Sequence, residues 1–124
     1  MTTVLVVDDN ASNRKLARDV LGAAGFGTLE AATGAKGIAL ATEREPDVIL
    51  LDLRLPDMHG AEVVRHLRDA EGTAGIPVVA MSAMSLREHG DWLEEAGFAG
   101  YLDKPIHVRT FPEQVRRFCA EAGG

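Results

Sequence analysis

Long apolar runs and paired cysteines are both missing from this 124-residue sequence. No apolar stretch approaches the length that a membrane-spanning helix needs. The opening residues, MTTVLVVDD, lack the basic start and the longer apolar run of a secretory signal. The only cysteine, Cys119, cannot form an internal disulfide, which suits a reducing compartment. We therefore expect a cytoplasmic protein that does not act at a membrane.

An excess of positive charge is missing too, because the formal net charge is −6. A chain of this charge has no general basic surface for neutralising phosphates, which argues against direct nucleic-acid binding. Arg109, Arg116 and Arg117 near the end could form a local basic patch, although a solvated helix face explains them more simply.

The length allows one domain with a sizeable core, and the content of 46% hydrophobic and 26% charged residues is ordinary for a globular protein. No internal repeat, low-complexity tract or linker divides the chain. We expect residues 1–124 to form a single domain, with no residues left for an output domain.

Short apolar runs alternate with helical patterns along the chain. Residues 4–7, 48–51 and 76–81 are apolar on both faces and rich in β-branched side chains, as buried parallel strands are. Residues 27–31 and 99–102 are less apolar, which is typical of strands at the edges of a sheet.

Amphipathic helical patterns lie between these runs. The first follows Asn10, which can cap a helix, and stops at Gly25. The apolar side chains of the five patterns are Leu16, Ala17, Val20, Leu21 and Ala24; Ala35, Ile38 and Ala39; Val63, Val64 and Leu67; Leu86, Trp92, Leu93 and Ala96; and Phe111, Val115, Phe118 and Ala122.

Five strand–helix units predict an α/β fold, with a doubly wound, five-stranded parallel sheet, five helices and right-handed crossovers. The three most apolar strands, which are the first, third and fourth, belong in the middle of the sheet. The flavodoxin-like strand order 2-1-3-4-5 places them there. A (β/α)₈ barrel would need about twice this length.

Polar residues follow four of the predicted strands. Asp8 and Asp9 come after the first strand, Asp52 after the third, Ser82 after the fourth and Lys104 after the fifth. Taken singly, each has an ordinary explanation as a helix cap, a turn residue or a loop residue. Because the carboxyl ends of parallel strands share one edge, where open α/β sheets bind ligands, we expect all five to converge there.

This set of side chains suits phosphoryl transfer. Three clustered carboxylates repel one another, and a hard cation such as Mg²⁺ relieves that repulsion. Asp52 can then act as a carboxylate nucleophile towards a phosphoryl group whose charge the metal neutralises. Lys104 supplies a second positive charge, and Ser82 can donate a hydrogen bond to a phosphoryl oxygen.

The sequence also resembles the receiver domains of two-component response regulators, the CheY-like superfamily, over essentially its whole length. The matching motifs are Val-Asp-Asp-Asn at 7–10, Leu-Leu-Asp-Leu-Arg-Leu-Pro-Asp-Met-His-Gly at 50–60, Met-Ser-Ala at 81–83 and Tyr-Leu-Asp-Lys-Pro at 101–105. The resemblance implies that a histidine kinase or a phosphotransfer protein delivers a phosphoryl group to Asp52. It also implies that the chain catalyses its own phosphotransfer and dephosphorylation without turning over an external substrate.

The resemblance implies roles for the metal ligands. Asp9 and Asp52 would contact Mg²⁺ directly, and Asp8 would act mainly through water. The backbone carbonyl of Arg54 would complete the ligands that the protein supplies.

Further roles follow from the same resemblance. Ser82 and Tyr101 resemble the switch pair: Ser82 moves towards the phosphoryl group, which Lys104 contacts, and Tyr101 turns inward. Arg54 and Met84 flank the approach of water to the phosphorylated aspartate. Neither side chain can take a proton from that water, so we expect a long-lived phosphorylated form.

Several alternatives stay open. The chain lacks the charge pattern that marks the dimer face of one large DNA-binding subgroup, so it resembles stand-alone receivers that relay phosphate or bind a target protein. The sequence could also be a receiver module cut from a larger sensor kinase. A degenerate receiver that binds partners without phosphate is a second possibility. A phosphohydrolase of the haloacid-dehalogenase type is a third, although Asp8-Asp9-Asn10 does not match its Asp-x-Asp pattern.

Overall fold

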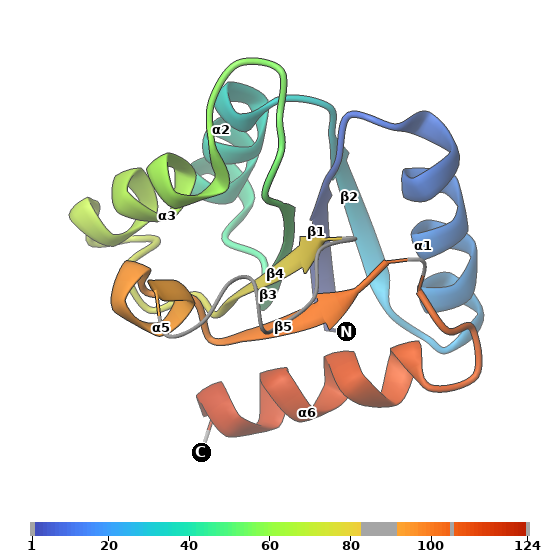
Figure 1. Ribbon diagram of the computed structural model, residues 1–124. Helices are drawn as coiled ribbons and strands as arrows, with labels where there is room; N and C mark the ends of the chain where they lie inside the picture. The colour runs from blue at the N-terminus through green and yellow to red at the C-terminus, as the bar shows by residue number, and fades with distance from the viewer. Residues whose placement is uncertain (1, 83–91, 105, 124) are drawn as a thin grey trace.

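The computed structural model describes residues 2–82, 92–104 and 106–123. Five parallel strands form one sheet in the order β2-β1-β3-β4-β5 (Figure 1). This confirms the predicted fold and strand order. The strands are β1 (Thr3–Val7), β2 (Gly27–Ala31), β3 (Val48–Asp52), β4 (Val78–Ser82) and β5 (Gly100–Asp103).

Helices cover both faces of the sheet. Helices α1 (Ala11–Ala23) and α6 (Phe111–Gly123) lie on one face, and α2 (Gly34–Arg44), α3 (Gly60–Asp69) and α5 (Trp92–Ala96) lie on the other (Figure 1). The predicted fourth helix corresponds at its end to α5, whereas Leu86 lies outside the described residues. Among the described residues, no helix is long and apolar enough to cross a membrane.

The alternation of side chains along the strands builds two cores. Val4 and Val6 face α1 and α6, whereas Leu5 and Val7 face α2 and α3. β3 and β4 are buried along their whole length, as expected of central strands that are covered on both faces. β4 begins at Val78, two residues later than predicted, because Pro77 has no N–H to donate and contributes only its carbonyl, to Ile49.

Helix α1 starts and stops where the sequence predicted. The side chain of Asn10 accepts hydrogen bonds from the backbone N–H groups of Ser12 and Asn13, and Gly25 follows the helix with φ at 96°. The predicted apolar stripe is wrong at Leu16, which is 39% exposed. Ala17 and Leu21 face the sheet as predicted, whereas the helical rotation carries Leu16 round to the solvent side.

The predicted inner face of α2 is also wrong in part, because Ala35 and Ala39 are exposed. Gly34, Gly37 and Ala41 face the core instead. A Cβ atom on Gly37 would lie 2.9 Å from Val7 Cγ2, so the absence of side chains lets this helix approach β1 closely. The predicted face of α3 is confirmed by the burial of Val63, Val64 and Leu67. In α6, Phe111 and Val115 are buried as predicted. The side chains of Trp92 in α5 and Ala122 in α6 lie outside the described residues.

A single arginine joins the end of α3 to two distant turns. Arg68 donates from Nη1 to the carbonyls of Ala74 and Ile76 at 3.0 and 2.9 Å, and from Nη2 to the carbonyl of Gly97 at 2.9 Å. Burial lowers the pKa of this guanidinium. A hydrogen bond from a charged donor stabilises a fold more than a neutral one does. Loss of the Arg68 guanidinium would leave the three carbonyls without their side-chain donor.

We expect Arg68→Met to lower the free energy of unfolding by about 2 kcal/mol, because one residue supplies several charge-assisted hydrogen bonds. Urea denaturation measures this, with Arg65→Met, an exposed arginine of the same helix, as the matched control. If Arg68→Met and Arg65→Met had the same free energy of unfolding, the hydrogen bonds of Arg68 would not stabilise the fold.

Candidate functional site

A cleft of about 350 Å³ opens at the carboxyl-terminal edge of the sheet. The strand register brings the ends of the strands together, since Val7 is level with Leu51 and Asp52 is level with Met81. The structure therefore gathers all five side chains predicted at this edge. The residues that line the cleft are Asp8, Asp9, Asn10, Asn13, Asp52, Arg54, Ser82 and Lys104.

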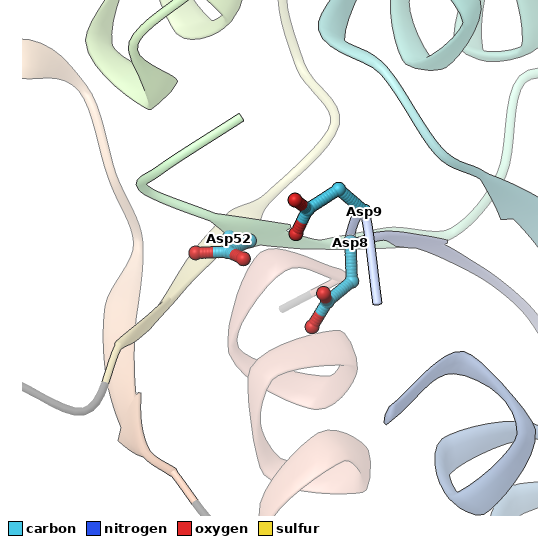
Figure 2. Close-up of side chains that lie close together, drawn as sticks. All are labelled: Asp8, Asp9 and Asp52. Carbon is cyan, nitrogen blue, oxygen red and sulfur yellow. The ribbon is translucent and has the colours of Figure 1, made fainter. Parts of the chain in front are cut away.

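Three carboxylates point towards one another in this cleft (Figure 2). One oxygen from each of Asp8, Asp9 and Asp52 lies within 4.8 Å of the others. Asp8 and Asp52 are buried, and Asp9 is exposed. Burying two acids side by side is unfavourable unless opposite charge compensates them.

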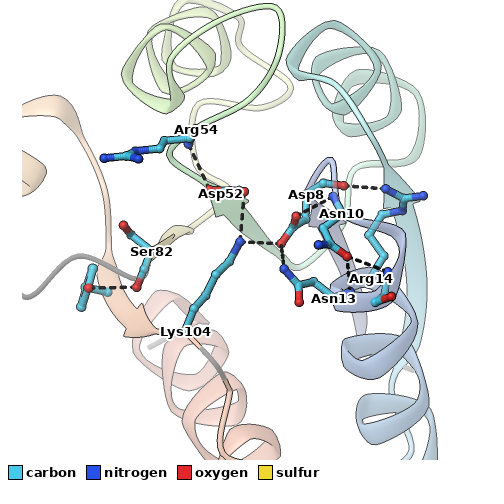
Figure 3. A network of polar contacts seen from close by, with 10 residues as sticks. Asp8, Asn10, Asn13, Arg14, Asp52, Arg54, Ser82 and Lys104 are labelled. Carbon is cyan, nitrogen blue, oxygen red and sulfur yellow. Dashed lines mark hydrogen bonds and ion pairs between the residues drawn. The ribbon is translucent and has the colours of Figure 1, made fainter.

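Lys104 supplies part of that compensation (Figure 3). Its Nζ lies 2.7 Å from Asp8 Oδ2 and 3.0 Å from Asp52 Oδ2. Burial lowers the pKa of the amine, but hydrogen bonds and charge attraction from the two aspartates outweigh it, so this pKa lies above its ordinary value. Lys104 is therefore a cation at neutral pH and ties the ends of β1 and β3 to β5.

The carboxylate of Asp8 is held by the start of α1. Asp8 Oδ1 accepts from the backbone N–H of Asn10 at 2.9 Å, and Asp8 Oδ2 accepts a long bond from Asn13 Nδ2 at 3.4 Å. Arg14 donates from Nη1 to the Asp8 carbonyl at 2.7 Å, and its Nε lies 3.4 Å from Glu30 Oε1 on β2. The first turn of α1 thus fixes the position of Asp8.

The carboxylate of Asp52 is fixed by the loop that follows it. Its Oδ1 accepts from the backbone N–H of Arg54 at 3.0 Å. The loop closes on itself through an antiparallel bridge between Arg54 and His59 and a bond from the Gly60 N–H to the Leu53 carbonyl. The guanidinium of Arg54 extends away from Asp8 and Lys104 (Figure 3).

Ser82 lies buried at the end of β4, on the wall of the cleft. The hydroxyl of Tyr101 donates to the Ser82 carbonyl at 3.1 Å, and the tyrosine ring packs against the core of α2, α3 and α5. Tyr101 thus already lies inward in this structure. Met84, the other residue predicted to flank the water path, and Pro105 lie outside the described residues.

Sequence reasoning missed the support that Asn13 and Arg14 give to Asp8. It identified Asn10 only as a helix cap. A signal was present, because residues in the first turn of a helix point back towards the chain that precedes it. Asn13 and Arg14 follow Asp8 by five and six residues, which returns their side chains to the end of β1.

Comparison with known proteins identifies the family. A family model described as the response regulator receiver domain matches residues 4–116. The chain belongs to this receiver family. Its members are parts of two-component signalling systems and are generally not turnover enzymes, so the phosphohydrolase alternative is set aside.

Curated relatives and solved structures agree with this assignment. The polar-differentiation response regulator DivK of Brucella ovis is 36% identical over 120 residues, covering 97% of this receiver and 98% of DivK. The chemotaxis response regulator CheY4 of Vibrio cholerae superposes with a TM-score of 0.89 at 30% identity, covering 95% of this chain and 98% of CheY4.

A third relative bears on the acidic cleft. The receiver domain of the sensor histidine kinase PA1611 from Pseudomonas aeruginosa superposes with a TM-score of 0.85 at 28% identity, covering 96% of this chain and 98% of that domain. That structure holds a magnesium ion coordinated in its active site cleft.

Proposed function

We propose that this receiver accepts a phosphoryl group on Asp52 from a histidine kinase or a phosphotransfer protein. The observation that carries the proposal is the Asp52 carboxylate itself. It lies buried in an acidic cleft, with one oxygen held by the Arg54 N–H and the other by the Lys104 amine. Such a carboxylate is oriented for attack and has a cation beside it to receive new negative charge.

The cleft suits a magnesium ion. Three carboxylates and one ammonium leave negative charge in excess, which a divalent cation would balance. Carboxylate and carbonyl oxygens are the ligands that Mg²⁺ prefers. We assign direct ligation to Asp9, Asp52 and the Arg54 carbonyl, with Asp8 acting mainly through water. When bound, the ion would supply neutralisation of the phosphoryl oxygens.

The side chains of the cleft take different parts in phosphoryl transfer and hydrolysis. An Asp52 oxygen attacks phosphorus, and the bond from phosphorus to the donor breaks, with its electron pair leaving on the donor. Lys104 balances the charge on the phosphoryl group, and the Ser82 hydroxyl donates to one of its oxygens. Attack by water later releases inorganic phosphate and restores the carboxylate, and we assign the tuning of this step to Arg54 and Met84.

The phosphorylated form acts on a downstream target protein through a changed surface. A reducing compartment suits the single thiol of Cys119, and we place the signalling in the cytoplasm.

Exposure to a small acyl phosphate donor tests this function. We expect the protein to gain one phosphoryl group per chain when Mg²⁺ is present and none when the metal is chelated. The protein should not turn over small phosphate esters. Lack of uptake with saturating Mg²⁺ would instead favour a degenerate receiver that binds its partners without phosphate.

Phosphorylation should change the contact between Tyr101 and Ser82. A Ser82 hydroxyl drawn to the phosphoryl group moves the carbonyl that Tyr101 contacts, and Tyr101 packs against the same core as Leu93 of α5. We expect amide shifts to extend from the cleft along β5 to Leu93 in NMR spectra. Tyr101→Phe, which keeps the ring and loses the hydroxyl, should reduce the shift at Leu93. Shifts confined to the residues that line the cleft would contradict this switch.

A further inference from the structure

The loop between Asp52 and α3 is fastened to the start of the neighbouring helix α2. Asp57 lies in this loop, and its two oxygens accept from the backbone N–H groups of Gly34 and Ala35 at 2.8 and 2.9 Å. These N–H groups belong to the first turn of α2, where no carbonyl within the helix can accept them. Hydrogen bonds from Gly34 and then Ala35 hold the pKa of Asp57 below its ordinary value, so it is a carboxylate at neutral pH.

Asp57 adds to the helix's own cap. The side chain of Thr33 already caps α2 by accepting from the Lys36 N–H at 3.1 Å. Asp57 therefore supplies a second cap from a position 23 residues away from Gly34 along the chain. A carboxylate at a helix N-terminus is also favoured by the helix dipole.

The residue after Asp57 makes a second contact at the same place. A Cβ atom on Gly34 would lie 2.5 Å from Met58 Cγ and 2.8 Å from Met58 Sδ. The Met58 side chain thus occupies space that a larger residue at position 34 would fill. Two neighbouring residues of the loop dock on the first turn of α2, one through hydrogen bonds and one through packing.

This docking constrains the backbone next to Asp52. The bridge between Arg54 and His59 makes the segment between them a tight reversal, with Asp57 inside it. Fixing Asp57 therefore limits the movement of Arg54, whose N–H orients the Asp52 carboxylate. The Arg54 carbonyl, which we assigned as a metal ligand, belongs to the same short segment.

We propose that Asp57 is a positioning residue for the magnesium site, because it anchors the loop that carries Arg54 to the start of α2. This inference rests on the proposed function. Asp57 is an exposed side chain, so water can satisfy the Gly34 and Ala35 N–H groups when the carboxylate is lost, and Thr33 still caps α2. Its effect is therefore expected on metal binding rather than on folding.

A graded pair of substitutions separates anchoring from charge. Asp57→Ala removes both acceptor oxygens, whereas Asp57→Asn removes the same charge but keeps one acceptor. Asp19→Asn, an exposed aspartate of α1, is the control for net charge. Calorimetric titration of the full chain with Mg²⁺ measures the dissociation constant of each variant. Thermal midpoints and the amide signals of Gly34, Ala35 and Arg54 are recorded without metal.

We expect Asp57→Ala to weaken Mg²⁺ binding about tenfold, as loss of a residue that orients metal ligands typically does. Asp57→Asn should fall between Asp57→Ala and the wild type, and Asp19→Asn should match the wild type. Thermal midpoints should stay close together, the Gly34 and Ala35 amide signals should move in both Asp57 variants, and saturating Mg²⁺ should restore the rate of phosphate uptake.

Two results would overturn this inference without affecting the proposed function. The first is that Asp57→Ala binds Mg²⁺ as tightly as Asp19→Asn does. The second is that Asp57→Ala and Asp57→Asn weaken Mg²⁺ binding equally, which would indicate an effect of charge only. Failure of the wild type to bind Mg²⁺ would contradict the proposed function and this inference together.

Discussion

Asp52→Asn is expected to abolish phosphate uptake from a small acyl phosphate donor. Asp52→Asn is nearly isosteric and keeps an oxygen that can accept from the Arg54 N–H, so the fold should survive. An amide has neither the charge nor the nucleophilic oxygen that phosphoryl transfer needs. The measurement is the intact mass of the protein after exposure to the donor with saturating Mg²⁺.

Asp19→Asn, which makes the same chemical change on the exposed side of α1, is the control and should take up phosphate as the wild type does. Far-ultraviolet circular dichroism of Asp52→Asn establishes that the variant is folded. Stoichiometric uptake by folded Asp52→Asn would show that another residue is the acceptor.

The second large effect is expected from Lys104→Met. The amine is the cation that lies between two buried carboxylates, at 2.7 Å from Asp8 and 3.0 Å from Asp52. Removal of one partner from a buried ion pair costs about 3–5 kcal/mol, because it leaves buried charge without compensation. We expect a loss of this size in the free energy of unfolding when Mg²⁺ is chelated.

Magnesium should recover much of that loss, because a bound divalent cation replaces the missing positive charge and binds only the folded chain. Urea denaturation with and without Mg²⁺ measures both effects, and Lys36→Met, an exposed lysine of α2, is the matched control. A Lys104→Met variant as stable as Lys36→Met in chelator would contradict this view of the cleft.

The pH dependence of the wild type follows from the same contacts. The pKa of Lys104 is raised in the folded chain despite burial, because both aspartates favour the charged amine. Its contribution to stability is therefore complete below the ordinary lysine pKa and is lost only as the pH rises through the higher folded value. The amine itself therefore stays charged when the pH is lowered from neutral.

The positions of the strands were enough to predict most of the side chains that line the cleft. Asp8, Asp52, Ser82 and Lys104 each follow an apolar run, and parallel pairing brings the ends of such runs to one edge whatever the helices between them do. The geometry of a parallel sheet thus converts positions far apart in sequence into neighbours, and no side-chain detail is needed for that step.

Details that depend on tertiary contacts were not predictable in this way. Helix α2 packs on the core through Gly34 and Gly37. Glycine has no side chain, so a pattern of apolar side chains does not identify this face. Asp57 caps α2 from 23 residues after Gly34 and 22 residues after Ala35, so no local sequence pattern indicates this contact. The partner of the Tyr101 hydroxyl is a backbone carbonyl, which has no signature in the sequence.

The location of the phosphoryl group in the wild-type chain tests the central claim most directly. After exposure to a small acyl phosphate with Mg²⁺, reduction with borohydride marks an acyl phosphate before digestion, and peptide mass spectrometry identifies the marked residue. Our account predicts the mark on Asp52 alone. A mark on Asp8 or Asp9, a phosphoester on Ser82, or no modification at saturating Mg²⁺ would contradict it.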